Sequence, residues 1–179
     1  MLYIFTHPSS GHHYLMRLLE QACDLPEGWH CDVHMAQPTG DTLVIKDHDF
    51  KLNSPPPPNI PILLQYRRDW LAATESWYDL GIRTGYWKDD SRGWRRFAAN
   101  KAYWTKSFLR RHEQHADLTI AYEDLVKDPV HWTKKAAELA ELEWREDPKK
   151  ENRELRRTKE YRYYDRLFFF ALQAVYDAL

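Results

Sequence analysis

The chain has few cysteines, no long apolar run and almost no net charge, and each of these absences excludes a class of protein. Two cysteines among 179 residues, Cys23 and Cys31, cannot form the disulfide framework of a small secreted domain. The longest apolar stretch, residues 167–175, is too short to cross a bilayer, and the N-terminal residues lack the basic lead of a signal peptide. A formal charge of −1 provides no global field that would attract nucleic acid. We therefore expect a cytoplasmic protein with no membrane span and no nucleic-acid partner.

Apolar runs of strand length alternate with segments of helical periodicity along most of the chain. Short β-branched and aromatic runs predict strands, and apolar residues at a spacing of three and four predict helices. The expected strands are residues 2–6, 42–46, 62–66 and 117–121, and the expected helices follow Gly11 and span about 70–80, 94–115, 130–141 and much of 149–179. This alternation predicts an α/β fold with a mostly parallel sheet covered by helices on both faces. The length, 179 residues, favours a single domain over the whole chain.

The turn between the first strand and the first helix has the composition of an anion site. Its residues are Ser9, Ser10, Gly11, His12 and His13. Backbone N–H groups at the start of a helix have no partner within the helix and attract negative charge, and a glycine lets the backbone approach a ligand closely. The segment lacks the G-x-x-x-x-G-K-[ST] pattern of nucleotide triphosphatases, so hydrolysis of a triphosphate with magnesium is unsupported.

Four segments, in order, resemble the motifs of the cytosolic sulfotransferase family. T-H-P-S-S-G-H-H-Y-L at residues 6–15 resembles the family's T-Y-P-K-S-G-T-T-W-L, and K-D-H at 46–48 resembles its K-T-H. I-L-L-Q-Y-R-R-D at 62–69 with Ser76 resembles its strand-R-(x)7-S element, and Y-E-D-L at 122–125 with D-P at 128–129 resembles its Y-E-D-L…D-P. The four matches cover residues 1 to about 130, and their shared order is more specific than any one motif.

The resemblance implies a P-loop-like three-layer fold and a reaction. The donor would be 3′-phosphoadenosine 5′-phosphosulfate (PAPS), whose sulfuryl group moves to a hydroxyl or amine of a small-molecule or glycan acceptor. His48 would be the general base, because imidazole titrates near neutral pH, and Lys46 would stabilise charge on the transferred group. The backbone amides of Ser10 to His13 would hold the 5′-phosphosulfate, and Ser9 belongs to the same cofactor-binding loop. The other donor contacts would come from aromatic rings against adenine and from polar groups on the 3′-phosphate: Tyr14, Tyr122, Arg68 or its neighbour Arg67, Ser76, Arg156 and Arg157.

Three features depart from the family pattern. Ser9 stands where the family has a lysine that neutralises the leaving group, and a hydroxyl cannot replace that charge. His12 and His13 replace two hydroxyl residues and would bind the phosphosulfate as cations or as hydrogen-bond donors. The basic segment at 155–159 lacks the glycines of the family's C-terminal segment.

The acceptor pocket and a metal site are the least defined by the sequence. Four aromatic residues flank the 81–91 loop and are candidates for lining the pocket, although aromatic side chains at helical spacing more often form core: Trp77, Tyr78, Tyr86 and Trp87. His30, Cys31 and His34 with Cys23 fit no standard zinc spacing, so we predict no metal.

Two other functions compete with sulfuryl transfer. A kinase-like phosphoryl-transfer enzyme on the same core would need a P-loop lysine and a metal-holding acid, and neither is in place. A noncatalytic nucleotide-binding or scaffold protein is favoured by Ser9, whereas Lys46 and His48 together argue for an enzyme.

Overall fold

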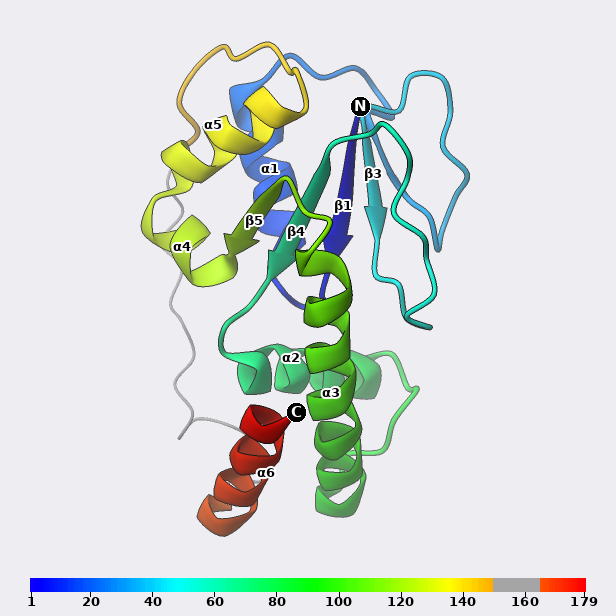
Figure 1. The fold of residues 1–179 in the computed structure, drawn as a ribbon, viewed down its shortest axis with the longest axis vertical. Coiled ribbons are helices and arrows are strands. Elements are labelled where there is room, and N and C mark those ends of the chain that lie inside the picture. The colour runs from blue at the N-terminus through cyan, green and yellow to red at the C-terminus, as the bar shows by residue number, and fades with distance from the viewer. Residues whose placement is uncertain (150–164) are drawn as a thin grey trace.

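A five-stranded parallel sheet forms the centre of the molecule in the computed structural model, which describes residues 1–149 and 165–179 (Figure 1). The strands are β1 (Leu2–Thr6), β2 (His30–Asp32), β3 (Val44–Asp47), β4 (Ile62–Tyr66) and β5 (Leu118–Ala121), in the spatial order β2-β3-β1-β4-β5. All four pairings are parallel. The chain therefore has the α/β fold that the sequence predicts, and β1 lies in the middle of the sheet with its carboxyl end in the central position.

Helices follow the strands and cover both faces of the sheet. They are α1 (His12–Ala22), α2 (Trp70–Arg83), α3 (Ser91–Glu113), α4 (Tyr122–Lys127), α5 (Pro129–Leu139) and α6 (Arg166–Ala178). The caps explain several of the boundaries, because the Asp69 side chain accepts a hydrogen bond from the backbone N–H of Ala72 at 3.0 Å and Pro129 occupies the first turn of α5. Both starts agree with the sequence prediction.

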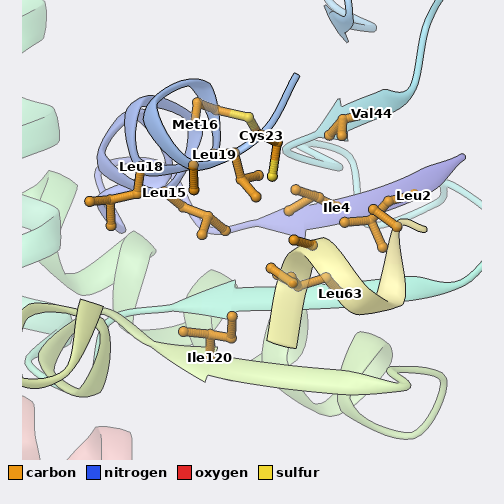
Figure 2. Packing of buried hydrophobic residues seen from close by; sticks show 14 of the residues in the cluster. Leu2, Ile4, Leu15, Met16, Leu18, Leu19, Cys23, Val44, Leu63 and Ile120 are labelled. Carbon is orange, nitrogen blue, oxygen red and sulfur yellow. The ribbon is translucent and has the colours of Figure 1, made fainter. Parts of the chain in front are cut away.

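Two apolar layers hold the sheet between the helices. On one face, α1 and α5 pack on the strands through a core that includes Leu2, Ile4, Leu15 and Leu19, all inaccessible to solvent (Figure 2). On the other face, Phe5 and Leu64 pack against Phe108 of α3. Consecutive side chains of a strand point to opposite faces, so Ile4 and Phe5 serve different layers. Burial on both faces is why the strands read as continuous apolar runs.

The first half of α3, together with α2 and α6, builds a separate apolar cluster beyond the carboxyl end of the sheet (Figure 1). Trp94 is fully buried in this cluster, and Phe169 of α6 packs against it. No helix in the described residues is both long and apolar enough to traverse a lipid bilayer. Arg156 and Arg157 lie outside the described residues.

Candidate functional site

The loop between β1 and α1 has the backbone geometry of an anion-binding turn. Ser9 (φ 59°) and Gly11 (φ 81°) both adopt left-handed conformations, which reverse the chain within a few residues. The buried Ser10 hydroxyl lies 2.7 Å from the Thr6 hydroxyl, and its amide donates to the His7 carbonyl at 3.0 Å. Gly11 immediately precedes α1, so the first backbone N–H groups of this helix point toward the loop. The loop lies at the carboxyl end of the central strand, where parallel sheets bind ligands.

Tyr122 supports this loop by direct packing. A Cβ atom on Gly11 would lie 2.1 Å from Cδ2 of Tyr122, so the ring is packed directly against the glycine. The Arg67 guanidinium carbon lies 5.3 Å from the centre of the same ring. Tyr122 is 8% exposed. It therefore packs between the loop and Arg67, and the contact with adenine that the resemblance implies stays a prediction.

The His48 imidazole is oriented at the loop by a hydrogen bond to the backbone. Its Nδ1 lies 2.7 Å from the Thr6 carbonyl oxygen, and because a carbonyl only accepts, Nδ1 carries the proton. This leaves Nε2 with a lone pair, and Nε2 has no hydrogen-bond partner among residues 1–149 and 165–179. Burial, with Lys46 nearby, lowers the pKa of His48 to about 4, so the ring is neutral at pH 7. Its ring centre lies 5.1 Å from that of His12 in the loop.

Lys46 also points to the loop, but its charge is already paired. The Nζ atom lies 2.6 Å from Oδ2 of Asp32 and 3.2 Å from Nε2 of His12. A protonated lysine only donates, so His12 accepts at Nε2 and carries its own proton on Nδ1. Lys46 and Asp32 face each other across the β2–β3 pairing, where they are register partners. The ion pair leaves little net charge beside the loop.

His12 and His13 do not act as cations near neutral pH, contrary to one of the two roles expected for them. Burial and the adjacent Lys46 lower the pKa of His12 to about 2. Partial desolvation and then Lys46 lower the pKa of His13, whose ring centre lies 4.0 Å from that of His12. Both rings remain available as neutral hydrogen-bonding groups. Together with Lys46 and Asp32 they line an open pocket of about 400 Å³ between α1 and β2.

Of the two candidate arginines, Arg67 is the one connected to the loop. Its guanidinium lies over Tyr122, and its Nε lies 3.9 Å from the Glu123 carboxylate. The Arg68 side chain is 55% exposed and is clamped in a bidentate pair by Asp124 of α4. Ser76 is half-buried on α2, and its hydroxyl makes no hydrogen bond within the described residues. The geometry favours Arg67, whereas the spacing of the sequence motif favours Arg68.

Several predicted contacts belong to the hydrophobic core. Tyr14 is 1% exposed and packs in the α1 core, so it cannot stack on a nucleotide in this conformation. Tyr78 and Trp87 stack on each other within the α2–α3 cluster, and a Cβ on Gly81 would collide with Trp87. These two rings are therefore core rather than acceptor pocket. Within the described ranges, His, Cys, Asp and Glu side chains form no group of three that could hold a metal ion.

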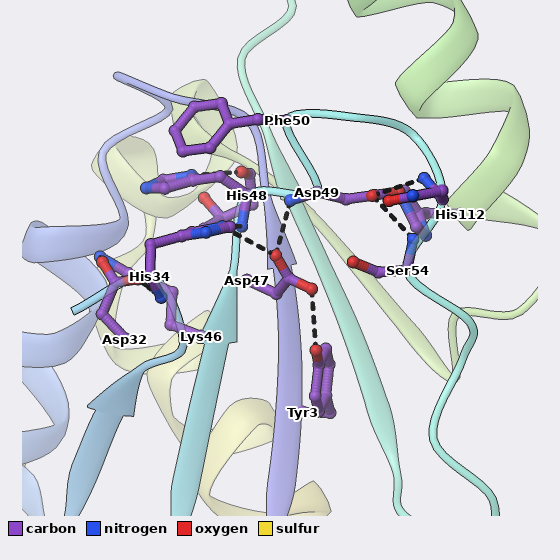
Figure 3. Close-up of polar contacts among 12 residues, drawn as sticks. Tyr3, Asp32, His34, Lys46, Asp47, His48, Asp49, Phe50, Ser54 and His112 are labelled. Atoms are coloured by element: carbon purple, nitrogen blue, oxygen red, sulfur yellow. Dashed lines mark hydrogen bonds and ion pairs between the residues drawn. The ribbon is translucent and has the colours of Figure 1, made fainter. Parts of the chain in front are cut away.

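The sequence prediction missed a network of acids and histidines around His48 (Figure 3). Asp47 accepts from the Tyr3 hydroxyl at 2.9 Å and from Nε2 of His34 at 3.0 Å. Asp49, which is 1% exposed, accepts from Nε2 of His112 at 2.9 Å. The sequence K-D-H-D at 46–49 could have indicated this network. Acids on both sides of a histidine at the end of a strand imply that hydrogen-bond donors for these acids lie nearby.

The arrangement combines an oriented neutral imidazole, a turn with two left-handed residues before a helix, and a paired lysine at one end of a parallel sheet. Such a site can remove a proton from a hydroxyl group beside a bound anionic ester. No protein-family model and no curated protein sequence matches the chain.

Proposed function

We propose that the chain binds PAPS at the β1–α1 loop and transfers its sulfuryl group to a hydroxyl or amine of a small-molecule or glycan acceptor. One observation carries the proposal: His48 is fixed on Thr6 at the root of the loop, with Nε2 unpartnered among the described residues and its ring 5.1 Å from His12. A general base must lie beside the reacting group, and this ring meets that condition.

The chain's own residues supply positioning and proton transfer. The amides at the start of α1 would hold the phosphosulfate in line with the acceptor. His48 Nε2 would take the acceptor's proton as the new bond from acceptor oxygen to sulfur forms and the bond from sulfur to the phosphate oxygen breaks. The Thr6 carbonyl stabilises the resulting imidazolium through Nδ1. Arg67, whose guanidinium lies over the Tyr122 ring, would meet the 3′-phosphate.

Calorimetric titration distinguishes this donor from a nucleoside triphosphate. The purified chain is titrated with 3′-phosphoadenosine 5′-phosphate and, separately, with ATP and Mg²⁺. We expect binding of the first at least tenfold tighter, with affinity lost on Arg67→Met and retained on Arg68→Met. Tighter binding of ATP with Mg²⁺ would overturn the proposal in favour of a phosphoryl-transfer enzyme.

A transfer assay with radiolabelled PAPS then tests catalysis. His48→Ala should abolish transfer to a panel of hydroxyl acceptors while 3′-phosphoadenosine 5′-phosphate still binds, because His48 acts on the acceptor side. His115→Ala, at an exposed histidine of no assigned role, is the matched control. Equal turnover by wild type and His48→Ala would remove His48 from the mechanism. Donor binding without transfer by the wild type would identify a noncatalytic nucleotide-binding protein.

A further inference from the structure

The His48 ring has neighbours of different chemistry. The ring of His12, in the loop, has its centre 5.1 Å away. The ring of Phe50 has its centre 5.2 Å away (Figure 3). If the donor occupies the loop beside His12, as proposed above, then the acceptor reaches the base next to Phe50. The residues that continue from Phe50 therefore determine the substrate class.

A strip of aromatic rings leads away from His48 through Phe50. Phe50 is 44% exposed, which is unusual for a large apolar side chain beside a buried histidine. Its ring centre lies 5.8 Å from that of Trp77 on α2, and Trp77 is only partly buried. Exposed aromatic faces of this kind bind planar apolar ligands. Trp77 was among the aromatic residues expected to line an acceptor pocket, and unlike Tyr78 and Trp87 it is placed next to the base.

The strip ends in a lysine that has no acid partner among residues 1–149 and 165–179. The Nζ atom of Lys101 on α3 lies 3.6 Å from the centre of the Trp77 ring. The centres of the Trp104 and Phe97 rings are farther away, at 5.1 Å and 5.4 Å. No ion pair or hydrogen bond of Lys101 occurs in the part of the chain that the structure describes. Desolvation lowers its pKa to about 8, so the ammonium is still mostly protonated at pH 7. A charge held among aromatic rings without a counter-ion is suited to an anion brought by a ligand.

The pocket beside His12 is the competing place for the acceptor. It is lined by Lys46, Asp32 and the two loop histidines, and His48 is not among its lining residues. An acceptor there would have no contact with the base. The Phe50 side satisfies that requirement, because Phe50 is a direct neighbour of the His48 ring.

We propose that Phe50, Trp77 and Lys101 form the acceptor site, and that the acceptor is an aromatic hydroxy compound bearing a carboxylate. Its ring lies on Phe50 and Trp77, its hydroxyl meets His48 Nε2, and its carboxylate pairs with the Lys101 ammonium. Lys101 is then a specificity-determining residue. The role of His48 in this assignment rests on the proposed function. The binding of the ligand by Phe50, Trp77 and Lys101 does not.

Two ligands that differ in charge and by one methyl group test the assignment. The probes are 4-hydroxyphenylacetate and its methyl ester, titrated calorimetrically into the chain with and without saturating 3′-phosphoadenosine 5′-phosphate. We expect the acid to bind at least tenfold more tightly than the ester. Lys101→Met should lower the affinity for the acid about tenfold and leave the ester unchanged, and Lys101→Arg should restore the preference. Phe50→Ser should weaken both ligands by similar factors.

Lys106→Met is the matched control, since Lys106 is also on α3 and its Nζ lies 4.8 Å from the centre of another aromatic ring, that of Tyr176. This variant should leave both affinities unchanged. Equal affinity of the wild type for acid and ester, or an equal loss of both on Lys101→Met, would overturn the assignment. Should Lys101→Met fail to fold, the salt dependence of wild-type binding decides, because only the acid should weaken with added salt. Failure of the nucleotide to bind, with acid-selective binding intact, would refute the proposed function alone.

Discussion

The ammonium of Lys46 and the carboxylate of Asp32 form an ion pair of 2.6 Å at the carboxyl edge of the sheet, and both side chains are largely shielded from solvent. The register of β2 against β3 places the two residues opposite each other. The pair neutralises the charge of Lys46 beside the loop, while Ser9 contributes no charge in the loop itself. The site therefore has the geometry of an anion site with most of its local positive charge cancelled.

Removing the acid should strengthen anion binding at the expense of stability. In Asp32→Asn, Lys46 keeps its charge and loses its partner, so the Kd for 3′-phosphoadenosine 5′-phosphate should fall about tenfold, which corresponds to about 1.4 kcal/mol. The free energy of unfolding should fall as well, by about 3 kcal/mol, because breaking a buried pair leaves one charge uncompensated. Calorimetry and urea denaturation measure the two effects.

Asp41→Asn provides the control, as it makes the same substitution at an exposed carboxylate in the neighbouring loop. It should change neither quantity by more than the experimental error. Unchanged nucleotide affinity in Asp32→Asn would mean that the ion pair does not limit the charge available to the ligand.

Adding a lysine to the loop should act by the same electrostatic route. Ser9→Lys places a cation where the sulfotransferase family carries one, at a residue whose φ of 59° is already left-handed for a side chain with a Cβ. The backbone cost is therefore similar for serine and lysine. We expect at least tenfold tighter binding of 3′-phosphoadenosine 5′-phosphate and faster sulfuryl transfer, whereas Ser9→Gln, of similar length and no charge, should do neither. Tighter binding with an unchanged rate of transfer would separate binding from catalysis.

The fold was predictable because its signals are local. The strand at Ile62–Tyr66 has the predicted bounds, and α2, α3 and α5 begin within three residues of their predicted starts. Strand β2 was missed, because His30–Asp32 is three residues long and has only one buried residue. A segment this short cannot show the alternation of apolar and polar residues that predicts a strand. That single omission hid the ion pair, because Asp32 meets Lys46 only when β2 pairs with β3.

The site was predictable in its position more than in its contacts. The carboxyl ends of β1 and β3 are neighbours in any sheet of this order, so His48 had to lie near the loop. The direction of Tyr14 was decided by helix phase instead: it lies four residues before Leu18 on the buried face of α1, and that spacing is visible in the sequence. The Lys101 contacts join α2 to α3 and depend on how two helices pack, which no local pattern specifies.

Gly11 should tolerate no side chain, for two separable reasons. Its φ of 81° disfavours any residue with a Cβ, at a cost of about 1 kcal/mol, and the new atom would overlap the Tyr122 ring. Gly85 has nearly the same φ, 78°, and a Cβ added there would meet no atom within 4 Å, so Gly85→Ala isolates the backbone cost. We expect Gly11→Ala to destabilise by about 2 kcal/mol more than Gly85→Ala in urea denaturation. Equal losses of stability in the two variants would show that the Tyr122 ring moves aside at no cost.

Three buried histidines should make the fold sensitive to acid. Burial lowers the pKa of His7 to about 3, of His12 to about 2 and of His48 to about 4, against an ordinary value of 6.5 in an unfolded chain. As the pH falls below 6.5 the unfolded chain takes up these protons, and the folded chain does not until about pH 4. The stabilisation is therefore complete above pH 6.5 and is lost as the pH falls toward 4.

Each of these histidines contributes a slope of about 1.4 kcal/mol per pH unit, so the three together remove about 4 kcal/mol per unit over the lower part of this range. That is a large fraction of the roughly 5–15 kcal/mol typical of a folded domain. Urea denaturation at half-unit steps from pH 7.5 to 4.5 measures the slope. His7→Gln, which keeps a polar group near the Thr105 hydroxyl 2.8 Å from Nε2 of His7, should reduce the slope by about a third, and His131→Gln at an exposed position should not. An identical slope in wild type and His7→Gln would mean that His7 is protonated in the folded chain and that its burial does not couple folding to pH.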